Sequence, residues 1–179
     1  FSDPDRDKVP FPSLAEALQA GGIHSRVEGD DKDSVLKTAI EMMALPKEVD
    51  RMFLLRVLLA RESLGSTGIG EGIAIPHVRN PIVMFIPQPM VTLCFLEKAI
   101  DFGSLDGKPV HTIFMIVSPT ISAHLNLLSR LSFALRHPAF SDAISRRGSR
   151  AEIAAAAALV DGSIPHRPSG NREEGAVQE

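Results

Sequence analysis

The chain has a single cysteine, Cys94, among its 179 residues, so an internal disulfide bond is excluded. This usage is typical of a reducing compartment, and we expect a cytoplasmic protein. The formal net charge of −3 gives no reason to expect nucleic acid or an anionic membrane as a main partner. No apolar run approaches the roughly 18–20 residues of a membrane helix, and the polar, acidic start predicts no signal peptide. A hydrophobic content of 44% is instead typical of a globular domain with a buried core.

Helical periodicity dominates the first third of the sequence. Ser13 opens a capping box at the start of a helix predicted over residues 13–22. A second helix is expected to begin at an Asp33 cap and to end before Pro46, and a third to span residues 47–62. The buried face predicted for this third helix comprises Val49, Met52, Phe53, Val57 and Leu58.

Short apolar runs bounded by glycine, proline and aspartate come next, and they are typical of strands in a covered sheet. The runs are "IAI", "VTLCFL" and "HTIFMIV". Helical periodicity returns over residues 121–136 and again from Pro138. This order predicts a single α/β domain with a mixed central sheet sandwiched between helices on both faces. We expect the domain to cover residues 13–161, after an N-terminal extension of residues 1–12 and before a disordered tail of residues 162–179.

The segment "STGIGEGIAIPH" places a histidine at the end of an apolar strand, after a glycine-rich loop. It lacks the Gly-Lys-Ser/Thr ending of a P-loop, and Pro76 stands where a dinucleotide-binding segment would continue into a helix. Nucleotide binding is therefore disfavoured. Proline fixes its own φ and favours extended geometry in the residue before it. His77 is thus expected to be held rigidly at a strand end, as a nucleophile requires.

Two further residues can accompany His77 in a site. His124 lies near the start of the helix predicted over 121–136, where free N–H groups favour an anion. A helix histidine bonded to a neighbouring loop has the same pattern. Arg61 ends the third helix, either as a surface residue that suits a helix C-terminus or as a fixed cation facing the same cleft. A metal site of His77, His124 and His111 is an alternative, but the histidine spacings match no usual metal motif.

These motifs occur together in a known protein family. The chain contains, in this order, "RESLGSTGIGEGIAIPH", "DFGSLDGKPV", "IFMIVSP", "HLNLLSRL" and "ALRHPAF". In these segments it resembles the type-2 EIIA domain of the bacterial phosphoenolpyruvate-dependent phosphotransferase system. That class comprises the fructose and mannitol EIIA domains and their nitrogen-regulatory relatives. The likeness extends approximately from Ser13 to Asp161.

The resemblance implies roles for three side chains. His77 would accept a phosphoryl group through Nε2, and His124 would be its companion imidazole. Arg61 would support the phosphoryl group. Neither a metal nor a cofactor is implied, because both ends of such a transfer are nitrogen or thiolate nucleophiles on proteins.

Further contacts with the phosphoryl group or with the partner protein are expected from the loop before His77. The threonine hydroxyl can serve as a donor or can stabilise the turn, and the glycines let the backbone come close to a partner. The glutamate matches the mannitol branch, whereas nitrogen-regulatory members more often have asparagine there. The residues concerned are Thr67, Gly68, Gly70 and Glu71.

The expected partners are proteins. The resemblance implies an HPr-like carrier as phosphoryl donor, and either an EIIB cysteine or a regulatory target downstream. The alternative is a module of the same fold that binds proteins without transferring a phosphoryl group, in a larger regulator with a DNA-binding domain. A start at Phe1 rather than methionine agrees with one part of a longer polypeptide.

Overall fold

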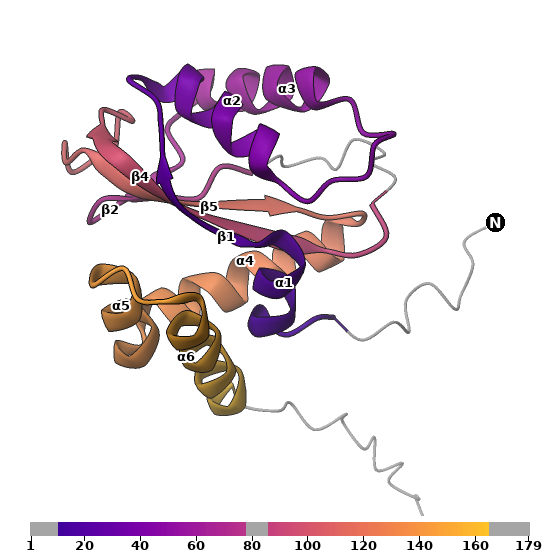
Figure 1. Ribbon diagram of the computed structural model, residues 1–179, viewed down its shortest axis with the longest axis vertical. Coiled ribbons are helices and arrows are strands. Elements are labelled where there is room, and N and C mark those ends of the chain that lie inside the picture. The colour runs from indigo at the N-terminus through magenta and orange to yellow at the C-terminus, as the bar shows by residue number, and fades with distance from the viewer. Residues whose placement is uncertain (1–10, 78–85, 165–179) are drawn as a thin grey trace, which may run out of the picture.

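A five-stranded mixed sheet forms the centre of the computed structural model, which describes residues 11–77 and 86–164 (Figure 1). The strand order is β1-β4-β5-β3-β2. β1 pairs with β4 in parallel and β4 with β5 antiparallel, while β3 is parallel to β5 and β2 antiparallel to β3. The strands are β1 (Ile23–Val27), β2 (Gly68–Gly70), β3 (Ile73–Ala74), β4 (Met90–Ile100) and β5 (Val110–Val117).

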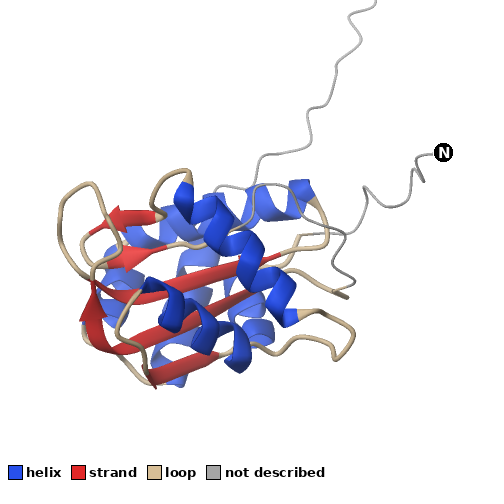
Figure 2. Cartoon of the chain, turned by 90° about the horizontal axis from the view of Figure 1, so that it is seen from above, coloured by secondary structure: helices blue, strands red, loops and turns tan. Residues whose placement is uncertain are grey.

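Helices cover both faces of this sheet. α2 and α3 lie on one face, and α1, α4, α5 and α6 lie on the other (Figures 1 and 2). The prediction of a single α/β domain with a helix-covered mixed sheet is therefore confirmed. The helices are α1 (Leu14–Gly21), α2 (Lys32–Met42), α3 (Arg51–Ser63), α4 (Ile121–Arg136), α5 (Pro138–Ser145) and α6 (Arg150–Ser163).

The central strands are apolar on both faces because each face has its own helical layer. On β4, Leu93 and Phe95 pack in the core beneath α1, α4, α5 and α6, whereas Cys94 and Leu96 pack beneath α2 and α3. Alternation of side chains along a strand produces this division. The same alternation decides the direction of every side chain in the strand that leads to His77.

Two helix starts show how capping fixes the boundaries. Ser13 caps α1 as predicted, since its Oγ accepts a hydrogen bond from the backbone N–H of Glu16 at 3.1 Å. The cap predicted at Asp33 for α2 is wrong, because Asp31 caps that helix. Asp31 Oδ1 accepts from the N–H of Ser34 at 2.8 Å, and Ser34 Oγ accepts from the N–H of Asp31 at 3.1 Å. This reciprocal pair satisfies two helix N–H groups, which Asp33 could not do.

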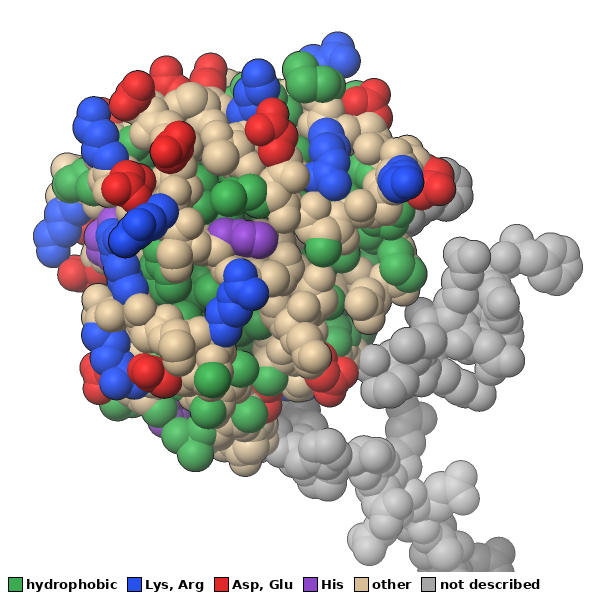
Figure 3. Space-filling model, viewed as in Figure 1, with side chains coloured by type: hydrophobic (Ala, Val, Ile, Leu, Met, Phe, Trp, Pro, Cys, Tyr) green, Lys and Arg blue, Asp and Glu red, His purple; other side chains and the backbone are tan. Residues whose placement is uncertain are grey.

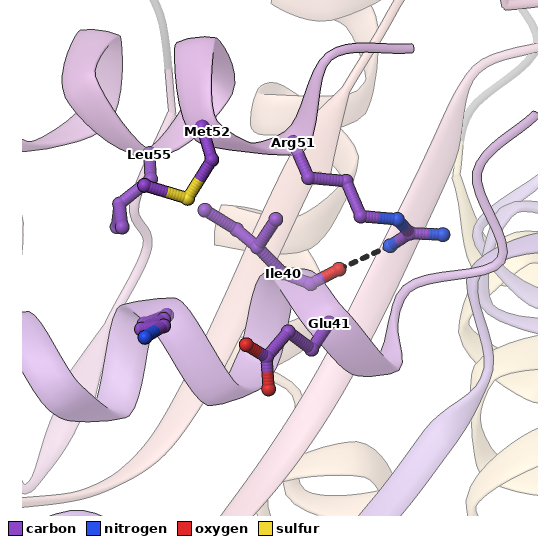
Figure 4. Close-up of a pocket in the computed structure, with 6 residues that line it drawn as sticks. Ile40, Glu41, Arg51, Met52 and Leu55 are labelled. Atoms are coloured by element: carbon purple, nitrogen blue, oxygen red, sulfur yellow. Dashed lines mark hydrogen bonds between the residues drawn. The ribbon is translucent and has the colours of Figure 1, made fainter. Parts of the chain in front are cut away.

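The buried face predicted for α3 is partly wrong. Met52 is 56% exposed and Phe53 is 43% exposed, while the buried residues of the helix are Leu54, Leu55, Leu58 and Glu62. Arg51 helps to set the rotation of the helix, because its guanidinium donates to the carbonyls of Ile40 and, at 3.1 Å, Met43 at the end of α2. Residues of the two helices line a hollow of about 170 Å³. Figure 4 shows Met52 and Ile40 among these lining residues.

The predicted boundaries at the two chain ends fall mostly outside the described residues. Residues 1–10 of the predicted extension and residues 165–179 of the predicted tail lie there. At the boundary itself, α6 continues to Ser163, two residues into the predicted tail.

Candidate functional site

His77 lies at the end of the strand segment that continues β3. It forms an isolated parallel bridge with Ile116 of β5, and the N–H of Ile116 donates to the carbonyl of Pro76 at 3.4 Å. Ile75 belongs to the core on the α4 side of the sheet. Because side chains alternate along an extended strand, His77, two residues further on, projects to the same side. The segment "AIPH" thus directs a half-buried imidazole toward α4.

One hydrogen bond fixes the state of the His77 ring. Nδ1 lies 2.6 Å from the carbonyl oxygen of Ile75. A carbonyl oxygen only accepts, so Nδ1 must carry the proton and donate. In the neutral ring, Nε2 then bears the lone pair. The backbone contact therefore leaves Nε2 as the unprotonated nitrogen of the neutral His77 ring.

His124 is the second imidazole of the site. It lies in the first turns of α4, whose N-cap Thr120 accepts from the N–H of Ala123 through Oγ1 at 3.2 Å. The two ring centroids of His77 and His124 are 5.2 Å apart, with an angle of 35° between the planes. His124 is only 4% exposed. The structure thus brings together two of the residues predicted from the sequence.

The surroundings of His124 favour its neutral form. Burial lowers the pKa of His124 below its ordinary value of 6.5, and the neighbouring His77 lowers the pKa further. Desolvation and a like charge both disfavour the imidazolium. At neutral pH His124 is therefore uncharged, its ring has one N–H donor, and the two rings do not repel each other as two cations would.

Arg61 lies in the last turn of α3, at the base of the loop that leads to β2. Its guanidinium Nη1 donates to the carbonyl of Gly65 at 2.9 Å. In the described part of the chain it bonds to neither imidazole. The side chain is half-buried, and within residues 11–77 and 86–164 its guanidinium has no hydrogen bond besides the one to Gly65.

Thr67 directs its polar groups inward, to a residue that the sequence analysis missed. Both its hydroxyl and its backbone N–H donate to the carboxylate of Glu62, the N–H at 3.2 Å. Glu62 is 7% exposed and pairs with Lys32 of α2 at 2.9 Å. An acidic residue in the last helical turn opposes the helix dipole, and this unfavourable position was the available signal that Glu62 has a special environment.

Two glycines of the loop make room for neighbours in the same chain. A Cβ at Gly68 would lie 2.0 Å from Oγ of Ser104, and one at Gly72 would lie 2.2 Å from Nε2 of His111. Gly72 also has a φ of +77°. Close packing against the segment before and at the start of β5 thus explains both residues, without a partner protein.

Gly70 and Glu71 form the tip of the β2–β3 hairpin. The N–H of Glu71 donates to Oδ2 of Asp106 at 2.9 Å, and its carboxylate pairs with Lys108 at 3.3 Å. The backbone of the next residue pairs with the start of β5, whereas His77 pairs near the end of β5. At about 3.3 Å per residue, the tip lies more than about 16 Å along the sheet from His77. Gly70 and Glu71 therefore cannot contact a phosphoryl group on that histidine.

The same geometry argues against the alternative of a metal site formed by His77, His124 and His111. His111 is at the start of β5 and bonds through Nδ1 to Oγ1 of Thr112 at 2.7 Å. It is separated from His77 by most of the length of the strand, so the two rings cannot share a metal ion with His124. In residues 11–77 and 86–164, no group of three or more candidate ligands is close enough to hold a metal.

Other surface properties bear on the partner classes. Across the described ranges, every helix is too short or too polar to cross a lipid bilayer. On the face seen in Figure 3, basic and acidic side chains are interspersed. That face therefore lacks the single-signed surface with which a protein follows a phosphodiester backbone.

A family model described as "Phosphoenolpyruvate-dependent sugar phosphotransferase system, EIIA 2" matches residues 16–157. Over 126 residues the chain is 36% identical to the nitrogen regulatory protein of Pseudomonas aeruginosa, covering 68% of this chain and 79% of that protein. Over 125 residues it is 35% identical to the fructose-specific EIIABC component of Bacillus subtilis, covering 68% of this chain. That match spans only 19% of the Bacillus protein.

Solved structures agree with these matches. The nitrogen regulatory protein IIA-Ntr of Neisseria meningitidis has a TM-score of 0.65 at 28% identity, with 75% of this chain and 92% of that one covered. The mannitol IIA protein of Escherichia coli has a TM-score of 0.61 at 20% identity, with 75% and 94% covered, and supports the fold alone.

Proposed function

The chain belongs to the EIIA 2 family of the phosphoenolpyruvate-dependent sugar phosphotransferase system, and on that basis we propose that it is a phosphocarrier whose acceptor is His77. The observation that supports this most directly is the 2.6 Å contact between His77 Nδ1 and the carbonyl of Ile75. It leaves Nε2 with its lone pair, beside a second imidazole. A core histidine needs neither feature.

The donor in this proposal is a phosphohistidine on an HPr-like carrier protein. Nε2 of His77 attacks the phosphorus in line while the nitrogen–phosphorus bond of the donor breaks. The donor imidazole leaves with the electron pair, so one nitrogen–phosphorus bond replaces another and no metal or cofactor takes part. For this transfer the protein must position the two reacting groups and stabilise the equatorial oxygens of the phosphoryl group.

His124 and Arg61 are proposed to supply that stabilisation. The ring centroid of His124 lies 5.2 Å from that of His77, so a neutral His124 can donate an N–H to an oxygen of a phosphoryl group carried on Nε2 of His77. Arg61 contributes a fixed positive charge at the base of the loop. Pre-oriented donors of this kind typically contribute about a hundredfold or more to a rate.

We propose residues 13–161 as the phosphocarrier unit. Support comes from Asp161 near the end of α6, whose carboxylate accepts from the N–H groups of Leu14 at 2.9 Å and Ala15 at 3.0 Å. These bonds join the first and last helices of the domain. A unit shortened at either end would lose them.

The onward step is proposed as transfer to an EIIB cysteine or as a regulatory contact controlled by phosphorylation. Relatives with both kinds of name match this chain to a similar degree, one a fructose-specific EIIABC component and one a nitrogen regulatory protein. One structural neighbour is a complex of the mannitol IIA enzyme with phosphorylated mannitol IIB from Escherichia coli.

The test is phosphorylation by a phosphorylated HPr-like carrier, followed by intact mass measured without acid. We expect one added phosphoryl group on the wild-type chain and none on His77→Gln, with the same circular dichroism spectrum for both. His111→Gln is the matched control and should still gain the group. If no plausible carrier phosphorylates the wild-type chain, the alternative of a non-transferring protein-binding module is favoured.

A further inference from the structure

A buried ion pair on the α2–α3 side of the sheet has no place in the mechanism above. The Glu62 side chain is 4% exposed, and its carboxylate accepts from Lys32 Nζ at 2.9 Å. Lys32 also lies over the ring of Phe102, 4.5 Å from its centroid. A carboxylate so far from water is costly unless it is fully compensated, and pairing it with lysine is seldom the most stable solution. The pair therefore calls for an explanation besides stability.

A continuous series of hydrogen bonds connects this pair to the nucleophile. Thr67 donates its N–H and its hydroxyl to Glu62. The carbonyl of Thr67 accepts from the N–H of Ile75 at 3.0 Å. The carbonyl of Ile75 in turn accepts from Nδ1 of His77 at 2.6 Å. Each link is short, and none passes through a flexible surface side chain.

This series controls the one atom on which the nucleophile depends. The Ile75 carbonyl holds the proton on Nδ1 only while it points at the ring. The direction of the Ile75 carbonyl depends on the backbone conformation of Ile75. The hydrogen bond from the N–H of Ile75 to the carbonyl of Thr67 restrains that conformation. Thr67 is held in turn by a carboxylate that is 4% exposed and paired with Lys32.

We propose that Glu62, held by Lys32, is a positioning residue that fixes the orientation and tautomer of His77 through Thr67 and Ile75. This inference rests on the proposed function of His77 as phosphoryl acceptor. A misplacement of about 1 Å in a reacting group can cost about a hundredfold in rate. The buried pair keeps Nε2 unprotonated and aimed at the incoming phosphorus, although it touches neither.

The experiment measures the tautomer directly. Long-range ¹H–¹⁵N spectra of the uniformly ¹⁵N-labelled full chain at pH 8 distinguish a protonated from an unprotonated ring nitrogen. For the wild type we expect a single His77 tautomer with Nδ1 protonated. For Glu62→Ala we expect a mixture of both tautomers and phosphorylation by the carrier that is slower by about tenfold or more.

The matched control is Asp161→Ala, which removes another mostly buried, ion-paired carboxylate, 3.6 Å from Arg130. It should keep the wild-type tautomer. Glu62→Gln keeps an acceptor oxygen for Thr67 and should restore most of the tautomer preference. If Glu62→Ala does not fold, Thr67→Val carries the test. It removes only the hydroxyl link and should also give a mixture.

The proposal is overturned by a folded Glu62→Ala or Thr67→Val chain with the wild-type tautomer and rate. Equal losses in Glu62→Ala and Asp161→Ala would also overturn it, because they would indicate a general loss of stability. If no carrier phosphorylates the wild-type chain, the proposed function fails, but the tautomer spectra still decide the positioning role.

Discussion

A half-buried histidine lies beside or within each end of β5, and the two rings have different surroundings. His77, beside Ile116, bonds to a backbone carbonyl and faces a second imidazole. His111, at the start of the strand, bonds to the side chain of Thr112 and lies against the backbone of Gly72. The residue type is the same, and the neighbours make the first ring the candidate for chemistry and the second a packing residue.

The largest effect should come from the imidazole that accompanies His77. Replacing His124 with alanine removes an N–H donor to the phosphoryl oxygens, so we expect phosphorylation of His77 to slow by about a hundredfold. His111→Ala, at the other end of β5, should change this rate by less than twofold. Rapid-quench measurement of the phosphorylated fraction tests both. Equal rates for the two variants would remove His124 from the site.

At the His111 end of β5, a substitution should change the stability of the fold instead of the phosphorylation rate. Gly72→Ala places a Cβ 2.2 Å from Nε2 of His111 at a φ of +77°, so we expect a loss of about 2 kcal/mol in the free energy of unfolding. In a His111→Ala background the clash is absent, and about 1 kcal/mol from the backbone should remain. Urea denaturation of the four chains gives the coupling. Additive losses would show that the ring and the glycine do not interact.

The smallest expected effect is on the pH dependence of the free energy of unfolding, to which His124, near one end of β5, and His111, at the other end, both contribute. Burial lowers the pKa of His124 and of His111, with further lowering by His77 and by Arg147 respectively. Below pH 6.5 these rings bind protons in the unfolded chain. In the folded chain they remain neutral until the pH reaches their lowered pKa values. The free energy of unfolding should therefore fall as the pH decreases through 6.5 toward the lowered folded values.

The measurement is urea denaturation at pH 8 and at pH 5.5. His124→Gln and His111→Gln should each make the free energy of unfolding less dependent on pH, because each variant removes one of these rings. A wild-type chain that is more stable at pH 5.5 than at pH 8 would contradict the prediction.

The sequence was sufficient for the architecture because the fold depends on periodicity. The short apolar runs of β4 and β5, bounded by glycine, proline and aspartate, are typical of strands covered on both faces. Periodicity was insufficient for α3, which is apolar on more than one side. The choice of face there follows from Arg51 binding the end of α2 and from the buried pair of Glu62 with Lys32, both long-range contacts.

The site was predictable to the extent that it depends on local chain geometry. Pro76 and the strand before it predicted a fixed His77, and the structure adds the Ile75 carbonyl as the acceptor. The separation of Glu71 from His77 was not predictable, because it depends on the register of the hairpin against β5. For Glu62 the sequence offers only one signal, an acidic residue in the last turn of α3, and this signal does not identify Lys32 or Thr67 as its partners.

The carboxylate of Asp161 bonds to the backbone of Leu14, so the outer ends of α1 and α6 lie within a few ångströms of each other. A domain whose ends meet can be placed inside a loop of another protein without stretching the host. It can also be circularly permuted, with a short linker from α6 to α1 and new ends elsewhere on the surface. With the new ends outside residues 77–124, such a permuted chain would keep both imidazoles on one continuous stretch of polypeptide.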